Sequence, residues 1–131
     1  MSGDQCLFCD SESAVLANDL VFARYDDFPV SDGHMLLIPK RHVANYFDMT
    51  DAEKQAMTQL LDEARKLLDA EKRPGGYNVG INCGPVAGQS VMHVHMHLIP
   101  RYEGDVEDPR GGVRGVIPAK QKYHDKVKQG A

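Results

Sequence analysis

Three histidines alternate with apolar residues near position 95 of this 131-residue chain. His93, His95 and His97 are each separated by one apolar residue, and a period of two is typical of a β-strand, whose successive side chains point to opposite faces. The three imidazoles therefore share one face. Because each buried ring nitrogen needs a hydrogen-bonding partner, three imidazoles make a poor core face. The pattern predicts a strand over residues 91–99 that lines a site rather than filling a core.

Strand geometry limits what these histidines can do together. At about 3.3 Å per residue, neighbouring histidines lie roughly 6.6 Å apart and the outer two roughly 13 Å apart. A bond from histidine to a metal is about 2 Å long, so His93 and His97 can hardly reach one ion. We therefore expect the triplet to divide between two centres, and a catalytic metal held by all three is disfavoured.

The remaining elements predict an α+β domain. Short apolar or alternating segments indicate strands over residues 20–25, 35–38 and 77–82. Thr50-Asp51-Ala52-Glu53 is a capping box, in which the Thr hydroxyl and the Glu carboxylate satisfy backbone donors at a helix start. Apolar residues then recur at helical spacing, at Met57, Leu60, Leu61, Ala64, Leu67 and Leu68. The helix should end at residues 73–76, and it should pack on one face of an antiparallel sheet.

Length, composition and charge exclude several classes of protein. A chain of 131 residues suits one domain, and 42% hydrophobic with 26% charged residues is ordinary for a globular protein. No apolar run approaches the ~20 residues of a membrane span, and the polar start Met1-Ser2-Gly3-Asp4-Gln5 is unlike a signal peptide, so the cytoplasm is the default location. The net charge of -4 argues against a nucleic-acid partner.

The charge is unevenly placed. Residues 103–108 carry four acidic groups, whereas residues 109–131 carry Arg110, Arg114, Lys120, Lys122, Lys126 and Lys128 against only Asp125. We therefore divide the chain into a domain over residues 1–102 and a basic extension over residues 103–131. The extension either folds over the site and meets the distal phosphates of a substrate, or forms a solvated terminus. Both interpretations stay open, and His124 in the extension is assigned no role.

The triplet and its surroundings resemble a known family. His93-Val94-His95-Met96-His97-Leu98-Ile99, preceded by Gly88-Gln89-Ser90, resembles the signature of the histidine triad (HIT) superfamily. Residues 33–42 look like the family's preceding strand, and residues 82–89 look like the loop before the triad, so the resemblance covers roughly residues 5–102. It implies a single HIT-like domain and a nucleotidyl hydrolase or transferase that acts on the α-phosphate of a nucleotide.

The resemblance also implies roles for individual residues. His95 matches the nucleophile, and a neutral imidazole is nucleophilic near pH 7 because its unperturbed pKa is about 6.5. A covalent nucleotidyl-His95 would divide one difficult displacement into two easier ones. His97 and His34 match groups near the phosphoryl oxygens, and Asp26 matches the position that binds the ribose hydroxyls. The other substrate-binding positions implied are Asn82, Gly88, Gln89 and Ser90.

A second centre is indicated by the cysteines. Cys6-Leu7-Phe8-Cys9 is a C-x-x-C pair, which in a cytosolic protein suggests a metal or redox site rather than a structural disulfide. His42 and His93 could supply two more ligands, and Cys₂His₂ is a closed structural zinc site. A zinc-bearing branch of the resembled family uses matching positions, so we expect zinc there. Cys83 is left over as a small loop residue.

Several alternatives stay open. The loop over residues 84–89 is more like dinucleoside-polyphosphate-cleaving members, whereas the C-x-x-C start is common in bacterial members, so the leaving group, such as a nucleotide or an amine, is undetermined. Water or inorganic phosphate could accept the nucleotide, and a non-catalytic nucleotide-binding protein is a further alternative. The interpretation as a metalloenzyme with His95 and His97 as ligands is weak, because the strand offers no carboxylate as a third ligand. Adenine is the default base, as in AMP or diadenosine polyphosphates, although acidic Asp27 stands where an apolar residue would stack more readily. The resemblance also implies a homodimer.

Overall fold

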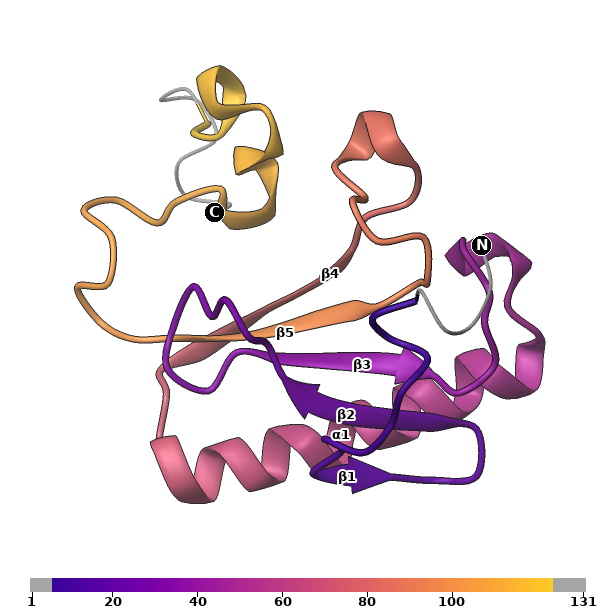
Figure 1. Ribbon diagram of the computed structural model, residues 1–131. Coiled ribbons are helices and arrows are strands. Elements are labelled where there is room, and N and C mark those ends of the chain that lie inside the picture. The colour runs from indigo at the N-terminus through magenta and orange to yellow at the C-terminus, as the bar shows by residue number, and fades with distance from the viewer. Residues whose placement is uncertain (1–5, 124–131) are drawn as a thin grey trace.

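Five strands form one antiparallel sheet, in the order β1-β2-β3-β5-β4, and one helix covers one of its faces (Figure 1). The computed structural model describes residues 6–123. The elements are β1 (Leu16–Ala17), β2 (Val21–Tyr25), β3 (Met35–Pro39), α1 (Asp51–Lys72), β4 (Gly76–Ile81) and β5 (Met96–Arg101). Short 3₁₀ turns lie at Tyr46–Asp48, Pro85–Ala87, Gly112–Val116 and Pro118–Lys120. The predicted α+β class is confirmed, and the two-residue strand β1 is an addition to it.

Helix α1 begins and ends as the sequence predicts. The Thr50 side chain accepts from the Glu53 backbone N–H at 3.0 Å, and the Glu53 carboxylate accepts from the Thr50 N–H at 2.9 Å. At the other end Arg73 takes a left-handed conformation with φ of 51°, directly before Pro74. These contacts satisfy backbone donors at the start of the helix, and the left-handed residue together with the proline stops it.

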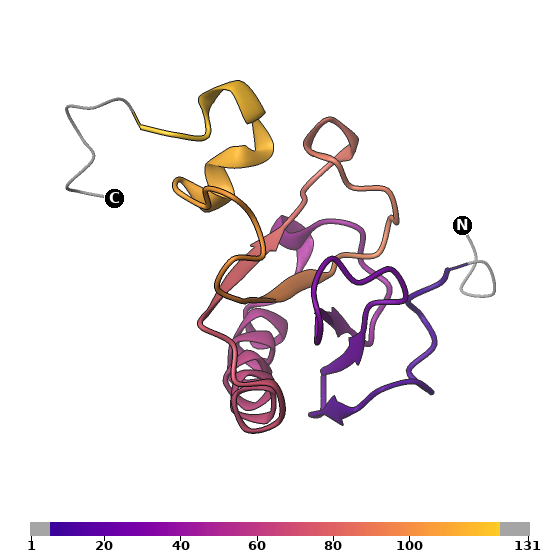
Figure 2. The ribbon, with the colours of Figure 1, turned by 90° about the vertical axis from the view of Figure 1, so that its left-hand side faces the viewer.

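The two faces of the sheet are covered by different segments (Figure 2). On one face, the helical stripe packs on alternate strand residues, among them Met35, Leu37 and Leu98. On the other face, Leu36 and Ile38 pack with Cys6 and Phe8 of the N-terminal segment. Because strand side chains alternate, β3 contributes to both layers. The second face is free of the helix, and the candidate site is built there.

Register places one row of residues across this second face. Arg24 of β2 pairs with Leu36 of β3, and Leu36 pairs with His97 of β5. Paired residues of an antiparallel sheet point to the same face. Arg24 and His97 therefore lie on one side of the sheet, with their Cα atoms two strand spacings, or roughly 10 Å, apart.

The triad strand is shorter than predicted. We expected a strand over residues 91–99, whereas β5 begins at Met96, so His93 and His95 precede it. The ring of His93 donates from Nε2 to the Pro39 carbonyl at 2.7 Å, and the backbone N–H of Val94 donates to Val43 O. Because proline has no backbone N–H and its carbonyl is taken by a side chain, the ladder between β3 and the triad segment ends there.

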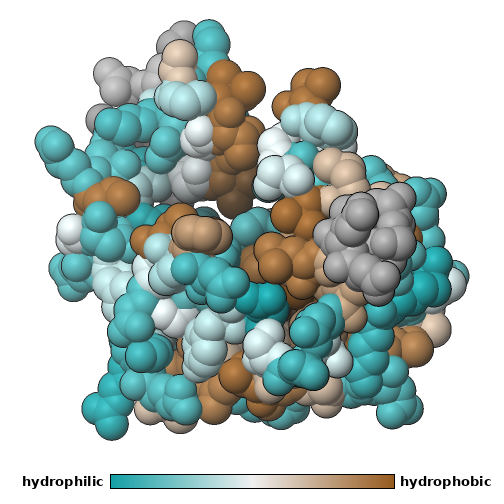
Figure 3. All heavy atoms as spheres, viewed as in Figure 1, coloured by the Kyte–Doolittle hydropathy of each residue, from teal (hydrophilic) through white to brown (hydrophobic). Residues whose placement is uncertain are grey.

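The acidic and basic extension folds into short turns beside β4. Several of its cations bind within it: Lys122 pairs with Asp108 at 3.2 Å, and Arg114 donates to the carbonyls of Lys120 and Gln121. Apolar side chains gather on the flank that faces the sheet and the loop over residues 82–90 (Figure 3). His124 and the basic residues after it lie outside the described residues. In the described part of the chain, no helix is long and apolar enough to cross a membrane.

Candidate active site

His95 is held in one tautomer at the centre of the second face. His95 is 8% exposed, and its Nδ1 lies 2.9 Å from the backbone carbonyl of His93. A carbonyl oxygen only accepts hydrogen bonds, so the Nδ1 of His95 carries the proton. The lone pair of the neutral ring is therefore on Nε2. The edge of Phe8 packs against the ring, with centroids 4.8 Å apart.

His97 is held by a chain of hydrogen bonds that starts in the backbone. The N–H of Val30 donates to Nδ1 of His34 at 3.2 Å, so a neutral His34 carries its proton on Nε2. That Nε2 lies 2.9 Å from Nδ1 of His97 and donates to it. The neutral ring of His97 consequently carries its proton on Nε2, which makes that nitrogen a hydrogen-bond donor.

Burial keeps both of these histidines neutral. It lowers the pKa of His97 to about 4, and the charges of His95 and His34 act in the same direction, while Asp26 opposes them. Burial also lowers the pKa of His34, again opposed by Asp26. Protonating either ring would place a positive charge in a desolvated environment, which is unfavourable. The tautomer chain described above therefore holds at neutral pH.

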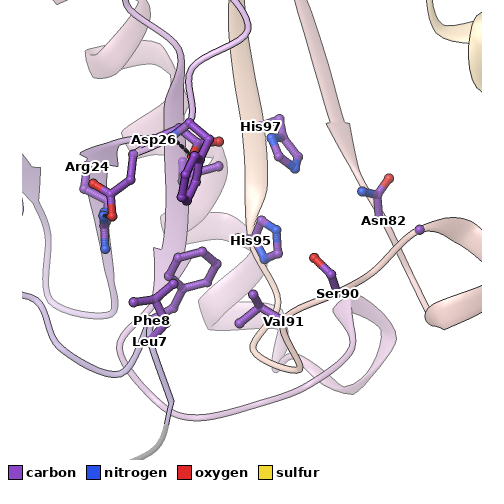
Figure 4. A pocket seen from close by; sticks show the side chains of 13 residues that line it. Leu7, Phe8, Arg24, Asp26, Asn82, Ser90, Val91, His95 and His97 are labelled. Carbon is purple, nitrogen blue, oxygen red and sulfur yellow. Dashed lines mark hydrogen bonds and ion pairs between the residues drawn. The ribbon is translucent and has the colours of Figure 1, made fainter.

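A pocket of about 330 Å³ opens on His95 and His97. Figure 4 shows these two rings and Ser90 on one side of the pocket and Arg24 on the other, with Phe8 between Arg24 and His95. The triad side of the pocket is polar, whereas the opposite side combines the apolar Leu7 and Phe8 with the charged Arg24. Its other lining residues are Asp27, Phe28, Leu36, Asn82, Gly88 and Val91.

The loop before the triad is built around Gln89. Its side-chain N–H groups donate to the carbonyls of Ala44 and Val91, and its oxygen accepts from the N–H of Gly84. Gln89 is 5% exposed, so these backbone partners occupy it. Gly88 has a φ of +97°, a conformation that favours glycine. The expected substrate contact of Gln89 is therefore indirect in this geometry, whereas Ser90 and Gly88 line the pocket.

The other residues that we expected near the substrate also differ in whether they line the pocket. Asp26 lines the pocket, and one of its oxygens accepts from the Phe28 N–H at 2.9 Å. Asn82 lines both this pocket and a second hollow of about 450 Å³ between the sheet and Gly112–Val116 of the extension. His34 is 3% exposed and lies behind His97, and it is not among the described residues that line the pocket.

A Cys₂His₂ group lies next to the triad. The ligand atoms of Cys6, Cys9, His42 and His93 all lie within 4.8 Å of one another. Nδ1 of His93 is 3.2 Å from Sγ of Cys6, and Nδ1 of His42 is 3.2 Å from Sγ of Cys9. Tetrahedral zinc with bonds of about 2.0–2.3 Å separates its donor atoms by roughly 3.3–3.8 Å. The distances therefore suit such an ion.

The protonation of this group also suits a cation. Because Nε2 of His93 donates to the Pro39 carbonyl, its Nδ1 lone pair points at the cysteines. Burial, a hydrogen bond with Cys6 and repulsion from a Cys6 thiolate raise the pKa of Cys9 to about 11. Two thiolates side by side need a positive charge, which a divalent ion supplies. The residues fit zinc.

A second group, formed by Asp26, His34 and His97, has ligand atoms equally close to one another but does not fit a metal. A neutral imidazole has one lone pair, and that of His34 accepts the Val30 N–H. If Nε2 of His34 bound an ion, the ring proton would have to lie on Nδ1, where it would face the Val30 N–H. The group is better described as a hydrogen-bonded support for His97.

Comparison with known proteins identifies the family. A HIT domain model matches residues 10–104. The chain belongs to the HIT family. The crystal structure of a HIT family protein from Bacillus anthracis superimposes with a TM-score of 0.73 at 34% identity, over 79% of this chain and 78% of that one. The AP-4-A phosphorylase of Mycobacterium tuberculosis is 37% identical over 98 residues, which are 73% of this chain and 50% of the phosphorylase. A zinc-bound histidine triad family protein from Mycobacterium smegmatis has a TM-score of 0.72 at 23% identity, over 99% of this chain and all of that one, and this shows a shared fold.

Several residues of the HIT site are absent from the sequence predictions. Leu7, Phe8 and Leu36 line the pocket, as do Arg24 and Phe28. Leu36 could have been found, because alternation along residues 35–38 places it opposite the helix. Leu7 and Phe8 lie between the two cysteines, so folding of that pair against the triad would have implied their position. Arg24 has no such local signal.

Proposed function

We propose that this HIT protein is a nucleotidyl hydrolase or transferase that cleaves at the α-phosphate of a nucleotide through a covalent intermediate on His95. The observation that carries the proposal is the tautomer of His95. Its Nδ1 donates to the His93 carbonyl, so the lone pair of the neutral ring is on Nε2, and the ring lines the pocket. A small, half-enclosed pocket of about 330 Å³ suits one nucleoside monophosphate unit.

The first step forms a bond from Nε2 of His95 to the α-phosphorus. The bond from that phosphorus to the bridging atom breaks, and its electron pair leaves with the leaving group. Negative charge accumulates on the phosphoryl oxygens, and stabilising it requires donors fixed in place. The Nε2–H of His97 is such a donor, and Ser90 and Asn82 add polar side chains on the same side of the pocket.

The second step returns the enzyme to its starting state. Water or inorganic phosphate attacks the nucleotidyl group, and the bond to Nε2 of His95 breaks with its electron pair returning to the ring. Asp26, which lines the pocket close to His97, would accept hydrogen bonds from the ribose hydroxyls. The HIT fold, and a relative named AP-4-A phosphorylase, support nucleotide polyphosphates as substrates, while phosphoramidates remain the alternative.

We further propose that Cys6, Cys9, His42 and His93 hold a structural zinc ion. Bound zinc would supply the charge that stabilises the two thiolates. It would hold the N-terminal segment against the triad and fix His93, whose carbonyl sets the tautomer of His95. The donor set supports this proposal, and the zinc-bound mycobacterial protein shares the fold.

Two features extend the proposal beyond the pocket. Strand β4 lies at the edge of the sheet, and Val79 on it is 40% exposed, which is compatible with the homodimer that the family resemblance implies.

The extension borders a hollow lined by His97 and Asn82, so its described part could approach a leaving group. It lines that hollow with Val113 and Val116 rather than with its cations.

The test is product analysis with diadenosine tetraphosphate and, separately, adenosine 5′-phosphoramidate, each with and without inorganic phosphate. We expect AMP release and an intact-chain mass increase of one nucleotidyl group, both lost in His95→Ala. ADP formed from the tetraphosphate only when phosphate is present would identify a phosphorylase. Tight AMP binding without turnover or adduct would refute the enzyme and leave a nucleotide-binding protein.

A further inference from the structure

The end of the pocket opposite the triad carries an ion pair among apolar residues. Nη2 of Arg24 lies 2.8 Å from a carboxylate oxygen of Asp27, and the Arg24 guanidinium lies 5.7 Å from the centre of the Phe8 ring. Leu7 and Phe28 line the same pocket. Aromatic and aliphatic groups suit the flat faces of a nucleobase, whereas a charged pair among them suits its polar edge.

Arg24 is placed by the sheet rather than by a mobile loop. It belongs to the row Arg24–Leu36–His97, so its Cα lies roughly 10 Å from that of His97 across two strand spacings. Its side chain is 9% exposed, and its Nε donates to the Tyr25 carbonyl. Among residues 6–123, its Nη1 has no hydrogen-bond partner, and Arg24 lines the pocket. Nη1 is therefore free to donate to a ligand.

Asp27 is held in a complementary way. Its side chain is 62% exposed, and one oxygen is anchored by Arg24. A carboxylate has about four acceptor positions, so most of them are not used by Arg24, and Asp27 lines the pocket. Together, Arg24 and Asp27 offer a ligand one guanidinium donor and carboxylate acceptors.

We propose that the Arg24–Asp27 pair recognises the base of the nucleotide and selects guanine over adenine. The Watson–Crick edge of guanine presents one acceptor, O6, beside two donors, N1–H and N2–H₂, and these are the groups that a guanidinium donor and a carboxylate would bind. Adenine presents one donor and one acceptor there, so at most two hydrogen bonds form. The third bond involves a charged group in a partly exposed place, and we expect it to favour guanine about tenfold.

This inference rests on the proposed function, because it assumes that the phosphate lies at His95. It changes the expected base from the adenine of the family default to guanine. The side chain that distinguishes the two is Asp27, at the position where an apolar residue would have stacked on the base without reading its edge.

The test is calorimetric binding of GMP, AMP and XMP to the full chain, compared among wild type, Asp27→Asn and the surface control Asp62→Asn. Wild type and Asp62→Asn should bind GMP about tenfold more tightly than AMP. In Asp27→Asn an amide donor replaces an acceptor, so GMP should lose its advantage. XMP, which has an oxygen in place of the guanine amino group, should gain relative to GMP. A general loss of folding would not produce this exchange of preference.

The possible failures are distinguishable. Equal binding of GMP and AMP, or tighter AMP binding, by a wild-type protein that forms the His95 adduct would overturn the base assignment and leave the proposed function in place. An unchanged preference in Asp27→Asn would do the same. Absence of nucleotide binding, and of an adduct from either diguanosine or diadenosine tetraphosphate, would overturn both.

Discussion

Replacing His34 should slow catalysis without weakening substrate binding. His34 is buried behind His97 and donates to its Nδ1 at 2.9 Å, which fixes the tautomer that leaves a donor on Nε2 of His97. In His34→Leu the Nδ1 of His97 loses its donor, at a cost of about 1–3 kcal/mol. If about 2 kcal/mol of this cost is added to the activation free energy, kcat decreases roughly 30-fold.

The assay is steady-state nucleotide release, with kcat and KM measured separately. Since His34 lies outside the pocket lining, KM should change little. His34→Gln is the matched variant, because its amide N–H can reach the region of the imidazole Nε2, and it should recover part of the lost kcat. A His34→Leu enzyme with wild-type kcat, or a defect confined to KM, would refute the proposed tautomer chain.

Three further predictions concern stability. The hydrogen bond and charge of Arg41, together with Thr50, lower the pKa of Glu53 to about 2. Glu53→Gln should therefore lower the free energy of unfolding, measured in urea near pH 7, by about 1–2 kcal/mol. This value allows for the exposure of Arg41. This difference should disappear as the pH falls from the unfolded pKa of 4.5 toward 2. The pKa of His97 is lowered from 6.5 to about 4, so the unfolded chain takes up the proton first and stability should fall as the pH falls between these values. In His97→Asn this pH dependence should be weaker by about 1 kcal/mol, allowing for partial exposure. The purified protein should contain one zinc ion per chain by atomic emission, and prolonged chelation should lower its Tm.

Each of these results has a control. Glu63→Gln changes an exposed carboxylate on the same helix and should leave the unfolding free energy nearly unchanged. An equal effect of both glutamate variants would contradict the role assigned to the Arg41–Glu53 pair. Identical pH slopes in wild type and His97→Asn would show that His97 titrates normally. Zinc retained by a Cys6→Ser/Cys9→Ser variant would place the metal elsewhere.

The local elements of this fold could be predicted from the sequence because short-range interactions determine them. The capping box at Thr50 and the stop at Arg73 involve neighbours in the chain, and alternation along the strands shows which residues share a face. The length of the triad strand could not be predicted in this way. It ends where the ring of His93 reaches Pro39, a contact across 54 positions of sequence.

In the candidate site, too, some features follow from spacing along the sequence and others only from tertiary contacts. The sequence by itself determined that three imidazoles share a face and that two cysteines form a C-x-x-C pair, because both depend on spacing along one segment. Only the tertiary structure decided that His34 supports His97, that Gln89 is occupied by backbone groups, and that Arg24 lines the pocket on the side of Phe8 away from His95. These arrangements follow from strand register and loop packing, which join distant segments. Spacing along the chain carries no information about which strand lies beside which.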